Sequence, residues 1–385
     1  MIELLTGQAA VSAAPDSEFT GTANPRHFNI SESLLDRAST LLEQAFAGQW
    51  GADRRLAEAF ATSDFRLAAF AAIDTEMLAA YDELPSVWRL YTDVTTTDDF
   101  RPKRLLSKWA NTVGLARAPE LTEYPAGKFG DATPYAIAVA KWGRRYAISW
   151  EAWLNNEAIG ELQDLPSVLA RQARETEAIA AVSNLLSVTL DADGNPSATD
   201  VNTAFFKTAN GNAPTALPLT RDNLKAVLDG MAVKKDPNTK RTVARPPVVV
   251  VVPKALEATL LGIIRPTTVR ITSGNTTVEQ VNEFGNLDYA VEPMLDYVNT
   301  NANAATTWFV VPKPGSPRPA LWTAFLRGHE QPDLRVKADT GARVGGGDIS
   351  PTEGSFELDD IQYRGRHVVG NQTADALFTY VSRGA

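Results

Sequence analysis

The sequence predicts an α+β protein, and three kinds of pattern support this class. Apolar residues recur at helical spacing over 31–48 and 64–84, and again over the longest stretch, 161–187. Apolar and polar residues alternate over 135–150, as in half-buried strands. Five consecutive valines at 248–252 lie between prolines, which suits a strand buried on both faces.

The first third of the chain combines an arm, helices and a long excursion. Residues 1–30 show no periodicity and predict an extended arm. Ser31 suits the N-cap of the first helix and Gly48 its C-cap, and a second helix is expected over 53–61. Residues 91–134 are rich in Pro, Gly and Thr and predict a loop-rich excursion. So long a loop in a compact domain is usually functional.

The two alternating strand patterns at 135–139 and 142–150 are out of phase, which predicts a β-hairpin with a bulge or turn at 141–143. Pro166 is expected in the first turn of the long helix. Asp191 begins a Gly- and Asn-rich loop, but the residues that follow do not match a calcium loop. The remaining expected elements are helices at 222–231 and 255–264, and strands at 308–311, 334–338 and 356–369.

Composition limits the chemistry available to the chain. Its 385 residues carry a net charge of −9 and contain no cysteine, which excludes disulfides, thiol nucleophiles and Cys-based zinc sites. Its three histidines, His27, His329 and His367, are far apart, so no metal site and no cofactor are expected. No stretch is long and apolar enough to span a membrane, and the N-terminal residues lack a basic signal region. A soluble protein with no membrane partner is expected.

Motifs for catalysis or nucleotide binding are also missing from the sequence. There is no G-x-S-x-G elbow and no G-x-G-x-x-G, and Gly345–Gly347 is not followed by the Lys-Ser/Thr of a P-loop. Adjacent acids such as Asp98 and Asp99 split to opposite faces of a strand. We therefore expect no catalytic residues. An enzyme or small-molecule binder with an unrecognised site is the weaker alternative.

Charge is distributed unevenly along the chain. Residues 1–100 contain 6 basic and 16 acidic side chains, whereas residues 101–145 contain 9 basic and 3 acidic ones. The contrast has three interpretations: two solvated surfaces, complementarity between copies of the chain, or a nucleic-acid patch. The last is the weakest, because the whole chain is acidic and the segment holds no recognisable binding motif.

Three stretches, in the right order, resemble the major capsid proteins of tailed bacteriophages, which have the HK97-type fold. The closest likeness is to the Mu-like major head subunit branch. The middle stretch, Val250–Glu257, is similar to the family's L-V-V-P-P-A-L-E. The others resemble the start of its long spine helix and its terminal hairpin. They are Ile148–Ala152, Asn155–Glu157, Leu165–Pro166 and Arg171–Glu177, then Thr307–Val310, Ala324–Gly328, Pro332 and Phe356–Arg366.

The resemblance implies a layout in five segments. Residues 1–90 would be an N-terminal arm with helices, and 91–149 the E-loop, an extended β-hairpin that reaches over a neighbouring subunit. Residues 150–215, with the spine helix, and 305–385 would form the peripheral domain. Residues 216–304 would form the axial domain.

The resemblance also implies a function: a structural capsid protein that self-assembles into an icosahedral shell around the double-stranded DNA of a tailed phage. Its partners would be its own copies in hexamers and pentamers, a portal protein, scaffolding or decoration proteins, and packaged DNA held without sequence-specific contacts. Assembly would take place in the host bacterial cytoplasm, and the product would be the virion capsid. An encapsulin-type nanocompartment shell is the alternative within the same fold.

Basic residues of the predicted E-loop are the candidate inter-subunit contacts. Each is weighed against the simpler interpretation of a solvated surface charge. Some capsid proteins of this fold also join a lysine to an asparagine of the next subunit. Lys128 and Asn371 lie in the corresponding regions, but their local motifs do not match. The candidate contact residues are Arg101, Lys103, Arg104, Lys128, Arg144 and Arg145.

Overall fold

The computed structural model forms two compact units, each made of three chain segments. The first unit comprises Met1–Pro85, Ala140–Thr176 and Leu326–Val368, and the second Ser86–Val139, Glu177–Phe325 and Val369–Ala385. Helices and several sheets occur together, which confirms the predicted α+β class. The structure describes residues 32–47, 49, 55, 63–107, 117, 119–124, 133–149, 158–236, 240, 242–273, 276–337 and 360–384.

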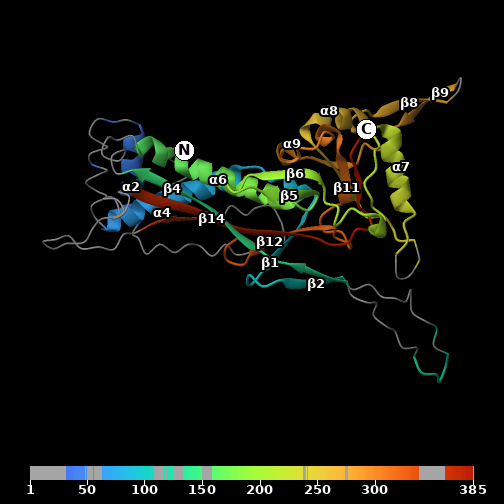
Figure 1. Ribbon diagram of the computed structural model, residues 1–385, viewed down its shortest axis with the longest axis horizontal. Coiled ribbons are helices and arrows are strands. Elements are labelled where there is room, and N and C mark those ends of the chain that lie inside the picture. The colour runs from blue at the N-terminus through green and yellow to red at the C-terminus, as the bar shows by residue number, and fades with distance from the viewer. Residues whose placement is uncertain are drawn as a thin grey trace. The chain divides into compact units, whose positions relative to one another are not determined.

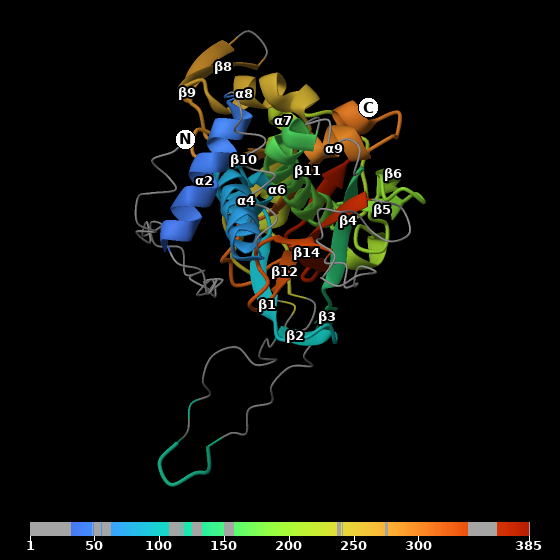
Figure 2. The same cartoon turned by 90° about the vertical axis from the view of Figure 1, so that its left-hand side faces the viewer.

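Helices and a sheet make up the first unit. Helix α2 (Glu32–Phe46) packs against α4 (Ser63–Glu83), as Figure 2 shows, and both confirm the helices expected there. The first part of β14 (Asp360–Thr373) pairs with β13 (Asp333–Val336) and with β4 (Ala140–Ser149). The first part of α6 (Ala158–Val182) also belongs to this unit.

The core of the first unit lies between α4, α6 and the sheet. Met77 and Tyr81 of α4 meet Leu165 and Leu169 of α6, together with apolar residues of β4 and β14. The guanidinium of Arg174 stacks on the Tyr81 ring at 3.6 Å, and its Nε donates a hydrogen bond to the Tyr81 carbonyl at 2.9 Å. Helix α6 is thus joined to α4 by apolar packing and by a cation–π contact.

A four-stranded sheet organises the second unit (Figure 1). Its order is β10-β7-β11-β15, comprising β10 (Asp288–Val291), β7 (Val248–Val252), β11 (Trp308–Pro312) and β15 (Tyr380–Ser382). β7 runs parallel to β10 and antiparallel to β11, and β15 runs antiparallel to β11. All five valines of β7 are buried, as the sequence predicted.

Helices cover one face of this sheet. Helices α7 (Arg221–Ala232) and α8 (Glu257–Ile264) pack on Val248, Val250 and Val252, and they appear beside β11 in Figure 1. The α7 helix begins at its N-cap Thr220, whose side chain accepts a hydrogen bond from the Asn223 amide. Residues of the opposite face alternate with these, and Phe309 there contacts Phe206 at 5.8 Å between ring centroids.

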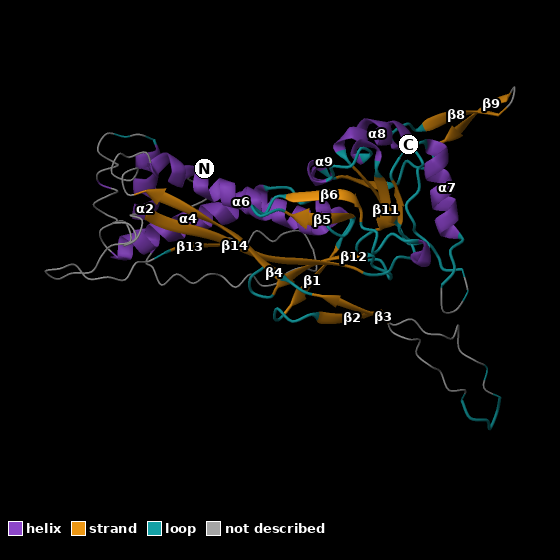
Figure 3. Ribbon diagram, viewed as in Figure 1, coloured by secondary structure: helices purple, strands orange, loops and turns teal. Residues whose placement is uncertain are grey.

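The other strands of the second unit form smaller assemblies. β12 (Leu321–Leu326) pairs with β1 (Asp93–Thr97) and with the last part of β14. Three two-stranded ribbons are labelled in Figure 3: β2 (Lys103–Ser107) with β3 (Thr133–Ile137), β5 (Leu186–Leu190) with β6 (Pro196–Val201), and β8 (Thr268–Ser273) with β9 (Thr276–Val281). The short helices are η1 (Val87–Leu90), η2 (Thr208–Asn210), η3 (Lys254–Leu256), α9 (Pro293–Val298) and η4 (Ala304–Thr306).

The structure corrects the expected hairpin over 135–150. β3 pairs with β2, with Lys103 opposite Ile137, whereas β4 pairs with β14, so the two alternating segments belong to different pairings. The excursion at 91–134 also contains β1, β2 and the start of β3. Local alternation identifies a strand, but it does not identify the partner of that strand.

The long helix differs from its prediction at both ends. It starts at Ala158, so Pro166 lies inside the helix rather than in its first turn. It ends at Val182 instead of 187, because a turn follows in which the Asn184 side chain donates to the Trp322 carbonyl at 3.2 Å. Leu185 is buried in that turn. Because a buried leucine outside the helix continues the apolar pattern of the helix, the pattern alone predicted a later end.

Asp191 stabilises the turn between β5 and β6. Its carboxylate accepts hydrogen bonds from the backbone amides of Asp193 and Asn195 and from the Asn195 side chain, which lower its pKa. Within the described ranges, no group of three or more His, Asp or Glu side chains is placed to hold a metal ion. The carboxylate of Asp191 therefore serves the hairpin turn.

Two glycines make a matched test of close packing. A Cβ on Gly370 of β14 would clash with the carbonyl oxygen of Ala138, whereas a Cβ on Gly230 of α7 would meet nothing within 4 Å. We expect Gly370→Ala to lower the free energy of unfolding by at least about 2 kcal/mol, because backbone must move. Gly230→Ala should raise it by about 0.5–1 kcal/mol. Urea unfolding of unassembled protein measures both, and equal stabilities would contradict the packing described.

Candidate inter-subunit surfaces

The chain enters the predicted E-loop from a buried hydrogen-bonded root. The Nε1 of Trp88 donates to the Glu177 carboxylate at 3.2 Å, and the Tyr91 hydroxyl donates to the Glu292 carboxylate at 3.1 Å. Glu292 is also the N-cap of α9 and accepts from the Met294 amide. Burial raises the pKa of Tyr91, with a further contribution from the Glu292 charge, and burial likewise raises the pKa of Glu292.

The next residues attach β1 to the same unit. The Asp93 carboxylate accepts a hydrogen bond from the Gly315 amide at 2.7 Å, and the buried Thr97 hydroxyl donates to the Phe325 carbonyl at 3.4 Å. Burial raises the pKa of Asp93 to about 6, although the Gly315 hydrogen bond opposes this shift. Register along β1 is thus held by side chains as well as by the ladder with β12.

The chain leaves the hairpin through an equally tight contact. After β3, Ala138 and Val139 pass directly against Gly370, where a side chain would clash with backbone. Val139 is buried, and so is Ile137, the last residue of β3. Both ends of the β2–β3 hairpin are therefore fixed within the second unit.

Three of the predicted contact residues lie at the start of this hairpin. The Nζ of Lys103 donates to the Thr96 carbonyl at 2.7 Å, so this half-buried lysine ties β2 back to β1. The Arg101 amide donates to the Asp99 carboxylate, while the side chains of Arg101 and Arg104 are exposed. Neither arginine forms an ion pair with any residue in the described part of the chain.

The remaining candidates lie in other parts of the chain. Arg144 and Arg145 are exposed on β4, in the first unit, where Arg145 makes one long hydrogen bond to Gln362 at 3.5 Å. Lys128 lies outside the described residues. Asn371 lies in β14, where its amide donates to the Asn184 side chain at 3.2 Å. Within the second unit, the structure thus brings together Arg101, Lys103 and Arg104.

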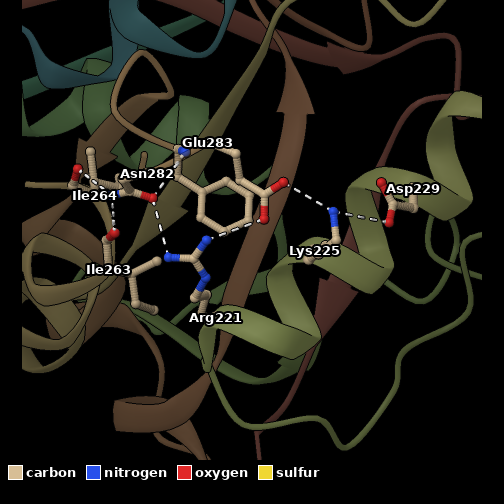
Figure 4. A network of polar contacts seen from close by, with 8 residues as sticks. Arg221, Lys225, Asp229, Ile263, Ile264, Asn282 and Glu283 are labelled. Carbon is tan, nitrogen blue, oxygen red and sulfur yellow. Dashed lines mark hydrogen bonds and ion pairs between the residues drawn. The ribbon is translucent and has the colours of Figure 1, made fainter. Parts of the chain in front are cut away.

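Basic residues on α7 are neutralised within the chain (Figure 4). Arg221 pairs with Glu283 at 3.4 Å, and Lys225 pairs with Glu283 at 3.0 Å and with Asp229 at 3.6 Å. The neighbouring Asn282 donates to the carbonyls of Ile263 and Ile264, which connects this network to α8. These cations already have partners, and Arg101 and Arg104 differ from them in this respect.

Taken together, these contacts define a hairpin whose two ends are fixed and which presents exposed guanidinium groups. In the part of the chain that the structure describes, no helix is both long and apolar enough to cross a bilayer. The model of the family described as "Phage capsid protein" matches residues 133–382, and the chain belongs to this family. It is a structural major capsid protein that self-assembles into the capsid shell of a virion, as the sequence predicted.

Solved structures similar to this chain include phage and capsid structures. One titled "Gordonia phage Cozz" has 13% identity and a TM-score of 0.44, and covers 78% of this chain and 86% of its own. The capsid of an empty GTA particle has 12% identity and a TM-score of 0.44, with coverages of 78% and 90%. The procapsid of satellite phage P4 has 11% identity and a TM-score of 0.42, with coverages of 80% and 98%. No curated protein matches the sequence.

Sequence reasoning missed the root of the hairpin. Trp88 and Tyr91 are almost fully buried and Asp93 is half-buried, yet they lie just before and within a segment expected to be loop. A local signal exists, since two aromatic residues three apart directly precede the Thr-rich run at 95–97. Their partners lie between 89 and 222 residues away in the sequence and leave no local signal.

Asp93 provides a pH-dependent test of the root. The pKa of Asp93 in the folded state lies above its ordinary value. Protonated Asp93 therefore makes its full contribution to the free energy of unfolding below about pH 4, and this contribution is lost as the pH rises through about 6. Asp93→Asn keeps an acceptor for the Gly315 amide without the charge. We expect its stability advantage over wild type to grow by on the order of 1–2 kcal/mol between pH 4.5 and 7.5, measured by urea unfolding. A constant difference would show that Asp93 does not titrate there.

Proposed function

We propose that this capsid protein forms hexamers and pentamers of an icosahedral shell in which the β2–β3 hairpin contacts a neighbouring copy through Arg101 and Arg104. One observation carries the proposal: both guanidinium groups are exposed without an ion-pair partner among the described residues, on a hairpin whose two ends are fixed. A fixed root allows the hairpin to bind a neighbour with less loss of conformational entropy.

Acidic helices offer a complementary surface on the neighbouring copy. After Arg66, helix α4 carries no basic residue, and its Glu76, Asp82 and Glu83 are exposed, as is Asp36 of α2. The helix nevertheless shields part of the Glu76 carboxyl from water, which raises its pKa, and the nearby negative charge of Glu43 adds to this effect. A guanidinium from another copy would relieve this like-charge repulsion. Such charge pairs contribute mainly to the association rate and to register.

The finer details of assembly belong to the same proposal. The five-segment layout, with its E-loop, peripheral domain and axial domain, is the arrangement in which the shell would form. A portal protein, scaffolding or decoration proteins and double-stranded DNA would be the partners, and assembly would take place in the host cytoplasm. The net charge of −9 supports a wall that encloses DNA without binding it tightly. The family described as phage capsid protein favours this function over an encapsulin shell.

Charge reversal at the hairpin tests the contact. Arg101→Glu combined with Arg104→Glu should lower the yield of particles at least about tenfold, because two attractive contacts become repulsive. The yield is measured by size exclusion and negative-stain microscopy. Circular dichroism should show an unchanged monomer, since neither side chain has an ion-pair partner among the described residues.

A matched double variant controls for the change in net charge. Lys207 and Arg245 are exposed and lie outside the predicted E-loop. Lys207→Glu with Arg245→Glu alters the net charge equally and should assemble normally. Wild-type particle yield from the Arg101/Arg104 variant would show that these residues do not mediate the contact.

A further inference from the structure

A short loop after α7 carries a dense group of basic residues. Residues 234–245, here called the basic loop, begin two residues after the end of α7, which is labelled in Figure 1. They include five basic residues and one acidic residue. The structure describes 234–236, 240 and 242–245 of this range. Because the chain as a whole has a net charge of −9, so dense a cationic segment is a local exception.

The one acidic residue of the basic loop is buried and neutralised. Asp236 forms an ion pair with the buried guanidinium of Arg318, which also pairs with Asp375 at 3.2 Å. Lys234 is half-buried, and its Nζ donates to the Gly211 carbonyl at 3.3 Å. These contacts use the carboxylate and one amine of the loop within the fold, so the charge that the loop presents to solvent is positive.

The other described cations of the basic loop face solvent. Lys235, Lys240 and Arg245 are exposed, and none of them forms an ion pair with any residue in the described ranges. The further exposed residues of the described loop are Thr242 and Ala244, so the loop exposes no large apolar group there. The core of a protein–protein interface is depleted of charged residues, whereas binding to a nucleic-acid backbone depends on Lys and Arg.

The backbone holds the two lysines close together. Lys235 and Thr242 form an antiparallel bridge, and the Lys240 amide donates to the Asp236 carbonyl at 2.9 Å, which closes a turn within the loop. Since Lys240 is two residues from Thr242, the Cα atoms of Lys235 and Lys240 lie within roughly 13 Å of each other. Both amines can therefore reach one stretch of a DNA backbone, along which the phosphates of one strand are spaced by about 3.4 Å of helix axis.

We propose that the basic loop binds the phosphate backbone of double-stranded DNA through Lys235, Lys240 and Arg245. The inference deepens the proposed function and rests on it, because the DNA is the molecule that the shell would enclose. Charge complementarity selects this partner, and contacts to phosphates alone carry no sequence information. Because the chain as a whole is acidic, the contact is confined to this loop, which agrees with a wall that does not bind DNA tightly.

Removing the charges of the two lysines tests the contact. Fluorescence anisotropy of a labelled duplex of mixed sequence measures binding to the unassembled chain at several salt concentrations. We expect Lys235→Gln with Lys240→Gln to lower the affinity at least about tenfold at about 50 mM salt, and to reduce the slope of log K against log salt by about 2. Lys235→Arg with Lys240→Arg keeps both charges and should bind within about threefold of wild type. Wild-type affinity and slope from the glutamine variant would overturn the proposal.

Two exposed lysines of the first unit provide a matched control. Lys141 and Lys337 form no ion pair with a residue in the described ranges. Lys141→Gln with Lys337→Gln changes the net charge equally and should bind DNA within about twofold of wild type. Equal losses from the two glutamine variants would show that the affinity follows net charge alone, and would overturn the basic loop as a site.

A competition experiment separates DNA from an acidic protein segment as the partner. The probe for an acidic segment is poly-glutamate with the same number of charges as the duplex. An extended polypeptide places one charge per about 3.3 Å, whereas duplex DNA places one per about 1.7 Å of axis. We therefore expect poly-glutamate to compete at least about tenfold more weakly than unlabelled duplex. Equal or stronger competition by poly-glutamate would assign the loop to an acidic protein and overturn the proposal.

The result is distinguishable from the test of the shell contact, because binding is measured on unassembled chain. If Arg101→Glu with Arg104→Glu assembles normally while the Lys235/Lys240 glutamine variant loses DNA affinity, the hairpin contact fails and the basic loop stands. If the Arg101/Arg104 variant loses assembly while the glutamine variant binds DNA as wild type does, the basic loop fails and the proposed function stands.

Discussion

The hydrogen bond between Tyr91 and Glu292 is the contact on which the arrangement of the hairpin depends. It is buried, and it joins the residues before β1 to the first turn of α9, beside the sheet that forms the main core of the second unit. Removing either partner would leave a buried polar group without a hydrogen bond, which is unfavourable. Together with the contacts of Asp93 and Thr97 and the ladder between β1 and β12, it fixes the chain that leads into the hairpin.

Basic side chains that form ion pairs within the chain have a different role from those that do not. Arg221 and Lys225 meet carboxylates within α7 and the loop that follows β9, so they stabilise the local fold. Arg101 and Arg104 have no such partners among the described residues and are available to another molecule. Exposed ion pairs contribute little to stability, whereas an unsatisfied charge held on a fixed element contributes to recognition.

The sequence predicts elements with a strong local signature and misses those defined by distant partners. Helices α2, α4 and α7 and the valine strand β7 are visible because periodicity and burial coincide. The pairing of β3 with β2, instead of with β4, depends on register between segments some thirty residues apart. The basic character of Arg101, Lys103 and Arg104 is readable from sequence, but only the structure shows that Lys103 is already bound to Thr96.

The long sequence separation of the root contacts has a consequence for timing. Tyr91 can form its hydrogen bond only after Glu292 has been synthesised. Asp93 likewise requires Gly315, which follows it by 222 positions. At a synthesis rate of about 5–20 residues per second, the hairpin, which ends at Ile137, is made roughly 8–35 s before the ribosome supplies Glu292 and Gly315. A nascent chain therefore carries its basic residues on an unanchored segment. The fixed root of the hairpin therefore forms only late in translation, after the chain has been made as far as Gly315.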